Sequence, residues 1–179
     1  MTGDDYILTA SGLKFYPLRP RSGDLYIKDI AHALAMKCRW GGHTRAFYSV
    51  AEHCIRCAEI VSPEVRLWAL LHDAAEAYLP DICRPIKQQY PQLVEAEDRI
   101  LALVCTRWGL PADMPTQVKW ADDTLMVTEA RDLMGFDARG DGRGTGLPEA
   151  QPVRIEPWGP AEAKHSFLKV FQSLVAEIV

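Results

Sequence analysis

Apolar residues recur at helical spacing along most of the chain. The clearest case is the segment EVRLWALLHDAAEAYL at residues 64–79, where apolar side chains occupy more than one helical face. A helix of that kind is expected to lie buried at the centre of a protein. Pro63 before the segment and Pro80 after it are typical of a helix start and a helix stop. The pattern therefore predicts one central helix over residues 64–79.

Five further segments also repeat apolar residues at helical spacing. They are residues 30–37, 50–61, 93–108, 118–134 and 160–178. Ser49, with Glu52 three residues later, forms a capping box at the start of the second segment. Gly109 and Gly135 directly follow the third and fourth segments, which is typical of helix ends. The sequence thus predicts helices throughout the middle and the end of the chain.

Two regions lack this pattern. Residues 1–26 hold two short apolar runs around a Ser-Gly turn signal, so we expect an irregular segment or a small hairpin. Residues 136–158 are rich in glycine and proline, which predicts a long loop that is mobile in part. We therefore expect one all-α domain over residues 1–179, with a core at 24–135 and a C-terminal helix at 159–179.

Charge and hydropathy restrict the partners that the chain is expected to have. The 179 residues carry a formal net charge of -4. A slightly acidic protein gains no long-range attraction to nucleic acid, so locally placed cations must hold any anionic ligand. No segment has the roughly 18 apolar residues that a membrane span needs, and the N-terminal residues lack the features of a signal peptide. We expect a cytoplasmic protein without nucleic-acid or membrane partners.

The cysteines favour reduced thiols over a disulfide framework. Their number, five, is odd, and the chain lacks a secretory signal. Cys54 and Cys57 form a C-x-x-C pair, but no second pair completes a zinc ribbon, and no βαβ pattern supports thioredoxin-like chemistry. We therefore interpret them as two core-facing cysteines on a helix.

His72 and Asp73 lie inside the predicted central helix, where they need an explanation. Burying an ionised carboxylate is costly unless it is paired or bound to a metal. Two similar groups, His53 and Asp122, lie on neighbouring predicted helices. Imidazole combined with carboxylate suits a divalent ion such as manganese, cobalt, iron, zinc or magnesium. A hydrogen-bonded core histidine is the alternative, and composition alone does not decide between them.

Further charged residues accompany these four. Glu76 follows His72 by four residues, so the two share a face of the predicted helix, and Asp81 lies in the loop behind it. A carboxylate beside a metal site is a candidate general acid or base, although a helix cap or a solvated charge is the alternative for each. Phosphate recognition by a negatively charged chain needs local cations, although each cation alone is more often a solvated surface residue. The candidates are Arg39, Arg84, Lys87 and Lys119.

Three segments closely resemble the HD-domain phosphohydrolases. They are YSVAEH at residues 48–53, LLHDAAEAYLPDICRPIK at 70–87 and VKWADDTLMVTEARDLM at 118–134. Together they contain the ordered signature H…HD…D, which is specific in this context. The similarity is greatest to the bacterial and phage 5'-deoxynucleotidase-like branch, which includes phage enzymes that hydrolyse dATP to deoxyadenosine and triphosphate. It spans about residues 24–135.

The resemblance implies a helical bundle around one divalent metal ion. The implied metal ligands are His53, His72, Asp73 and Asp122. Other implied roles are catalytic acidic residues at Glu76 and Asp81, nucleotide contacts at Arg39 and Trp40, and phosphate contacts at Lys87 and Lys119. Asp122 is preferred over Asp123 because it follows Lys-x-Ala, as in the family. His43 lies near the site in sequence and could contact phosphate, with a plain loop histidine as the equal alternative.

The implied activity is hydrolysis of the 5'-phosphate ester of a nucleotide, most of all a deoxynucleotide. One form is a dNTP triphosphohydrolase, which releases deoxynucleoside and triphosphate and whose substrate would bring additional Mg²⁺. The other is a 5'-deoxynucleotidase, which releases deoxynucleoside and phosphate. The presence of Lys87 and Lys119 slightly favours the substrate with the longer phosphate chain. We also expect a homo-oligomer, and the alternative function is a nucleotide-binding regulator without catalysis.

Overall fold

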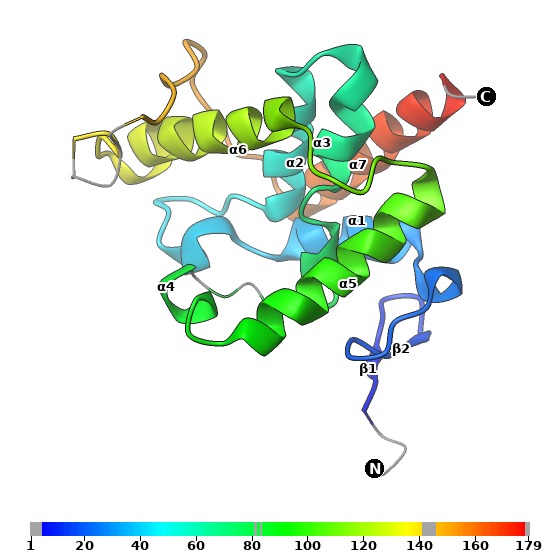
Figure 1. The fold of residues 1–179 in the computed structure, drawn as a ribbon. Helices are drawn as coiled ribbons and strands as arrows, with labels where there is room; N and C mark the ends of the chain where they lie inside the picture. Colours follow the sequence, from blue (N-terminus) through cyan, green and yellow to red (C-terminus); the bar gives the residue numbers. More distant parts are fainter. Residues whose placement is uncertain (1–4, 81, 83, 141–145, 178–179) are drawn as a thin grey trace.

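The computed structural model describes residues 5–80, 82, 84–140 and 146–177, and it is mostly helical. A short antiparallel hairpin near the N-terminal end pairs β1 (Ile7–Leu8) with β2 (Lys14–Phe15). The α-helices are α1 (Ile27–Met36), α2 (Val50–Glu59), α3 (Arg66–Leu71), α4 (Arg84–Lys87), α5 (Pro91–Trp108), α6 (Thr116–Glu129) and α7 (Pro160–Ala176). Tighter turns are η1 (Ser22–Asp24), η2 (Arg39–Gly42), η3 (Pro63–Val65) and η4 (Ala74–Ala77), and η5 (Ala130–Met134) is a π-helical turn. The predicted all-α fold with a short N-terminal hairpin is therefore confirmed (Figure 1).

Helix α2 lies at the centre of the fold. It packs against α1, α3, α6 and α7, and Figure 1 shows α6 on one side of it and α7 on the other. Ser49 caps the helix, because its hydroxyl accepts a hydrogen bond from the Glu52 amide at 3.1 Å. The carboxylate of Glu52 accepts from Arg56 and from the backbone amide of Trp158. Ser49 thus fulfils its half of the predicted capping box, while Glu52 binds a distant segment.

The predicted continuous helix over residues 64–79 is wrong in one respect. The structure divides it into η3, α3 and η4, with the break at His72 and Asp73. Asp73 has φ -99° and ψ 14°, in the sparsely populated bridge region where many active-site residues lie. Glu76 therefore lies in a 3-10 turn, and its amide donates to the Asp73 carbonyl at 2.9 Å. Apolar periodicity continues through this break, which explains why the pattern did not reveal it.

Two predicted helix ends are confirmed at glycines. Gly109 closes α5 with φ 66°, and Gly135 follows η5 with φ 79°. Both values lie in the left-handed region, which favours glycine because it has no Cβ. At Gly135 a Cβ would also collide with the guanidinium of Arg45. The chain therefore turns sharply away after η5.

The predicted loop at 136–158 is anchored to the helices over its described later part. Its residues 141–145 lie outside the described residues. The backbone amides of Gln151, Ile155 and Trp158 donate to side chains at 2.9, 2.9 and 2.8 Å. The acceptors are Thr128 on α6, Asp132 on η5 and Glu52 on α2. Polar side chains of three elements thus fix the path of this segment to α7.

None of the described helices combines the length and the apolar character needed to cross a bilayer.

We expect Asp132→Asn to lower the free energy of unfolding by about 1–3 kcal/mol, because the buried carboxylate accepts from Arg131, Arg154 and the Ile155 amide. Burial alone would raise the pKa of Asp132, but these hydrogen bonds hold it below its ordinary value. The contribution is therefore present at neutral pH and is lost as the pH falls through this lowered pKa. Urea unfolding at pH 7 and at pH 3 measures both effects.

The exposed Asp98 on α5 provides the control for this prediction. Asp98→Asn should change the unfolding free energy by less than about 0.5 kcal/mol. Equal stability of the two variants at pH 7 would contradict the anchoring role of Asp132.

Candidate metal centre

The four predicted metal ligands come from three separate parts of the fold and lie together. Helix α2 supplies His53, the junction of α3 and η4 supplies His72 and Asp73, and α6 supplies Asp122. His53 Nε2 is 3.3 Å from Asp122 Oδ1, and His72 Nε2 is 3.4 Å from Asp73 Oδ2. The centroids of the two imidazole rings are 5.3 Å apart. We call these four residues, with Arg39 and Glu129 described below, the central cluster.

Some of these side chains are spaced closely enough to share one ion. Two overlapping triplets, His53–Cys57–His72 and Cys54–His72–Asp73, each have their ligand atoms within 4.8 Å of one another. Asp122 belongs to neither triplet, although it contacts His53. A group of buried histidine, cysteine and aspartate side chains could therefore hold a metal ion.

Both imidazoles are oriented by a hydrogen bond at Nδ1. His53 Nδ1 lies 2.6 Å from Glu129 Oε1, and His72 Nδ1 lies 2.7 Å from the Ala69 carbonyl oxygen. Acceptors at Nδ1 leave Nε2 of each ring to face the central cluster, the arrangement usual for metal-binding histidines. His72 Nε2 and Asp73 Oδ2 are buried without a hydrogen-bond partner among the described residues. Their nearest printed neighbours are each other at 3.4 Å and, for Asp73, Arg39 at 3.5 Å, so a bound cation would give both atoms a closer partner.

Arg39 lies among the carboxylates of the central cluster. Its guanidinium nitrogens are 3.5 Å from Asp73 Oδ2, 3.9 Å from Asp122 Oδ1 and 3.4 Å from Glu129 Oε2. Burial by itself would lower the pKa of Arg39, but the carboxylates outweigh burial and raise it well above its ordinary value. Arg39 therefore carries a fixed positive charge inside the cluster.

The central cluster contains more acidic groups than Arg39 can offset. Burial would raise the pKa of Asp122, but His53, His72 and Arg39 hold it well below its ordinary value. Burial would also raise the pKa of Glu129, yet the charges of Arg39 and His53 lower it to about 2. Both carboxylates are thus ionised at neutral pH, and Asp73 adds another acidic group nearby. Protonated His53 and Lys119 offset part of this negative charge, and a divalent cation that displaced the His53 proton would take over that role.

Cys54 and Cys57 are buried, as the sequence predicts for core-facing cysteines. Cys57 Sγ also lies 3.5 Å from His53 Nε2, a contact that the sequence pattern did not indicate. Burial raises the pKa of both thiols. They therefore remain protonated unless a cation binds beside them.

The other predicted site residues lie at varying distances from the central cluster. Glu76 is buried in η4 and interacts electrostatically with Arg39. Lys119 pairs with Asp122 at 3.5 Å and with Asp123, whereas Lys87 pairs with Glu97 at 2.5 Å. His43 is exposed at the end of η2, and none of its contacts among the described residues reaches the cluster. Asp81 lies outside the described residues.

Glu129 is a member of the central cluster that the sequence analysis missed. It is fully buried and contacts His53, Arg39 and the indole nitrogen of Trp40. One signal was available, since Glu129 follows Asp122 by seven residues, or two helical turns, on the same face of α6. Trp40 thus lies beside the cluster, with its indole N–H bound to a carboxylate, and its predicted contact with nucleotide stays a prediction.

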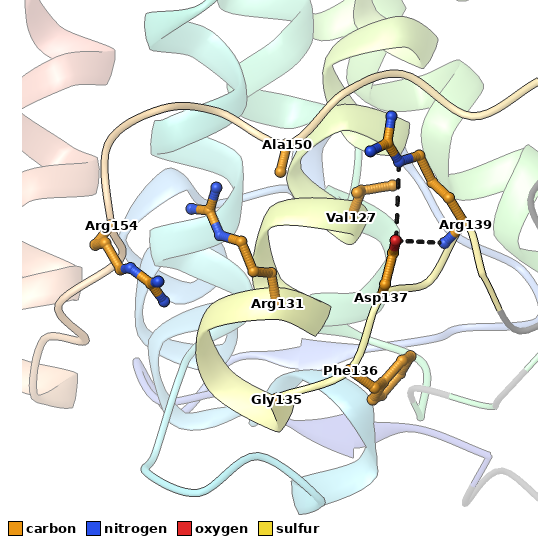
Figure 2. Close-up of a pocket in the computed structure, with 8 residues that line it drawn as sticks. All are labelled: Val127, Arg131, Gly135, Phe136, Asp137, Arg139, Ala150 and Arg154. Carbon is orange, nitrogen blue, oxygen red and sulfur yellow. Dashed lines mark hydrogen bonds and ion pairs between the residues drawn. The ribbon is translucent and has the colours of Figure 1, made fainter.

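A separate pocket of about 360 Å³ lies beside η5 (Figure 2). Its lining residues are Val127, Arg131, Gly135, Phe136, Asp137, Arg139, Ala150 and Arg154. The three arginines are already paired, because Arg131 and Arg154 bind Asp132, and Arg139 binds Asp137. Phe136 packs edge-on against Trp40, with ring centroids 6.2 Å apart. The pocket therefore adjoins Trp40 without containing any of the predicted ligands.

Comparison with known proteins reveals two bacterial relatives. Uncharacterized protein YfdR of Escherichia coli is 39% identical over 173 residues, covering 94% of this chain and 95% of the relative. An uncharacterized protein of Rhodobacter capsulatus is 38% identical over 176 residues, covering 88% of this chain and 89% of the relative. No protein-family model matches the chain.

We expect Asp122→Asn to weaken Mn²⁺ or Co²⁺ binding by at least about 100-fold, because Asp122 faces His53 in the central cluster. Asp123→Asn should leave the affinity within about threefold, because Asp123 pairs with Lys119 instead. Isothermal titration calorimetry of the two variants compares neighbouring carboxylates on one helix. A larger loss of metal affinity in Asp123→Asn than in Asp122→Asn would make Asp123 the better candidate for the metal ligand.

We expect metal affinity to fall as the pH is lowered. Burial and Arg39 lower the pKa of His53, but Glu129 and Asp122 outweigh them and raise it well above 6.5. A proton therefore competes with the ion at His53 below this raised pKa, and the affinity should drop by about tenfold per pH unit. Titrations between pH 6 and pH 8, in buffers of different ionisation enthalpy, measure the affinity and the released proton. An affinity independent of pH would contradict the competition.

Proposed function

The chain belongs to the same protein family as YfdR of Escherichia coli, and we propose that it is a divalent-metal-dependent phosphohydrolase of the HD type. Its substrate would be a (deoxy)nucleotide, cleaved at the 5'-phosphate ester. The observation that carries the proposal is the convergence of His53, His72, Asp73 and Asp122, in the order H…HD…D, with both Nε2 atoms next to carboxylates. Purely structural histidines and aspartates would not need this shared arrangement.

The proposed ion would be held by His53, His72, Asp73 and Asp122, with its identity among cobalt, manganese, zinc, iron and magnesium open. When bound, it would act as a Lewis acid toward the phosphate and would activate water. Glu76 is the described residue best placed for proton transfer, because it is buried in η4 and lies near Arg39. It would accept a proton from the attacking water or supply one to the leaving 5'-oxygen.

Arg39 would stabilise the negative charge that develops on the phosphate. In the structure its guanidinium offsets Asp73, Asp122 and Glu129. Once a divalent cation balances these carboxylates, the guanidinium becomes available for a phosphate oxygen. Lys119 lies beside Asp122 and is 47% exposed, so it could contact the outer side of the same phosphate group.

The length of the phosphate chain depends on cations beyond the α-phosphate. Lys87 pairs with Glu97, and Lys119 pairs with Asp122 and Asp123. Because each lysine already has acidic partners, the case for a triphosphate is weaker than the sequence alone indicated. Both dAMP and dATP therefore stay in the proposal, the latter with additional Mg²⁺.

The decisive experiment incubates the metal-replete protein with dAMP and dATP, together with the other (d)NMPs and (d)NTPs, in Mn²⁺ or Co²⁺. We expect release of nucleoside with phosphate or with triphosphate. Glu76→Gln should bind the ion normally and lower kcat by about 100- to 10,000-fold, because a positioned acid or base is lost.

The exposed Glu64 supplies a matched control, and Glu64→Gln should keep the wild-type rate. If none of the nucleotides is hydrolysed, the proposed activity is contradicted. If nucleotides then bind without being cleaved, a regulatory nucleotide-binding protein becomes the better description.

A further inference from the structure

The carboxylate of Glu129 links two parts of the candidate centre through its two oxygens. Oε1 lies 2.6 Å from His53 Nδ1. Oε2 accepts from Trp40 Nε1 at 2.9 Å and from Arg39 at 3.4 Å. The side chain is fully buried, so water does not compete for these bonds. A single acidic group therefore serves both a candidate metal ligand and the Arg39–Trp40 pair.

The backbone of Trp40 depends on such a contact. Its φ is 58° and its ψ is 27°, a left-handed conformation that is unfavourable for a bulky residue. Strain of this kind persists only where surrounding contacts hold the residue in place. The bond from Trp40 Nε1 to Glu129 and the edge-on packing against Phe136 are such contacts. The position of η2 is thus tied to α6 through Glu129.

We propose that Glu129 is a positioning residue that couples cation binding at His53 to the placement of Arg39 and Trp40. The coupling rests on the proposed function, in which these two residues meet the phosphorylated substrate. A divalent cation on Nε2 takes the place of a proton and thereby changes how strongly the imidazole donates from Nδ1 to Oε1. That change alters how strongly the same carboxylate accepts from Trp40. Cation binding is thereby transmitted to the substrate-binding side of the centre.

Glutamine cannot replace Glu129 in this role. A carboxylate can accept from both His53 and Trp40, whereas an amide has one accepting oxygen and one donating nitrogen. In Glu129→Gln the amide nitrogen must face either the Trp40 N–H, which only donates, or His53 Nδ1, which accepts only if the imidazole proton moves to Nε2 and so occupies the metal-binding nitrogen. Trp40→Phe removes the indole donor, and Arg39 keeps Asp73 and Asp122 as partners, so in the double variant the single amide oxygen can turn to His53. The two substitutions should therefore be strongly non-additive.

The first measurement is Zn²⁺ affinity by competition with a chelating dye. Glu129→Gln should weaken binding by about 10- to 100-fold, and Trp40→Phe by less than about threefold. The double variant should recover most of the loss. A structural effect without coupling would instead make the double variant at least as weak as Glu129→Gln.

The second measurement is the indole N–H resonance of Trp40, identified by its absence in Trp40→Phe. Zn²⁺ should shift this resonance in the wild-type chain but not in Glu129→Gln at saturating metal. Glu52→Gln is the matched control, because Glu52 is equally buried on α2 but binds Arg56 and the Trp158 amide. It should keep both the metal affinity and the metal-induced shift.

The outcomes separate this coupling from the proposed function. A wild-type chain that binds no divalent ion would overturn both. Metal binding that is unchanged in Glu129→Gln, or a Trp40 resonance that does not respond to Zn²⁺, would overturn the coupling alone. If Glu129→Gln weakens Zn²⁺ binding and abolishes the shift of the Trp40 resonance, but the wild-type chain hydrolyses no nucleotide, the coupling holds and the proposed activity is overturned.

Discussion

The bond between His53 and Glu129 is the contact on which the interior arrangement depends. Imidazoles, carboxylates and a guanidinium are tolerated together inside a protein only when each finds partners. The 2.6 Å contact between Nδ1 and Oε1 orients His53 on α2 and fixes the end of α6 against it. The second oxygen of Glu129 accepts hydrogen bonds from Trp40 and Arg39, so η2 is also bound to the end of α6. Helices from distant parts of the sequence are thus joined by polar contacts as well as by apolar packing.

Features of the fold that depend on local chemistry were predictable from the sequence. Ser49 caps α2, and Gly109 and Gly135 follow helix ends. A cap needs a nearby hydroxyl acceptor and a helix end often needs a residue with positive φ, and both needs are visible in a few consecutive residues. The break at His72 and Asp73 was not predictable in this way. Apolar spacing continues through it, and the bonds of His72 to the Ala69 carbonyl and of the Glu76 amide to the Asp73 carbonyl leave no mark on that spacing.

The part of the candidate centre that could be predicted is the set of residues in the ordered signature H…HD…D. His53, His72, Asp73 and Asp122 were expected together, and they lie together. Glu129 was missed because an acidic residue on a helix usually faces solvent, and its spacing of seven residues from Asp122 does not reveal that it is buried. Cys57 follows His53 by four residues on α2, so helical spacing places the two on one face, but it did not show that both side chains are buried there.

The segment before α7 is attached through its own main chain, by the amides of Gln151, Ile155 and Trp158. Every amino acid except proline offers that donor. The side chain of Gln151 could therefore vary during evolution while Thr128, Asp132 and Glu52 are kept, whereas Ile155 and Trp158 also pack against the core. Relatives could not accept proline at any of the three positions, nor insert a residue between 151 and 158 without shifting the register. Sequence divergence in this stretch would consequently conceal an unchanged path.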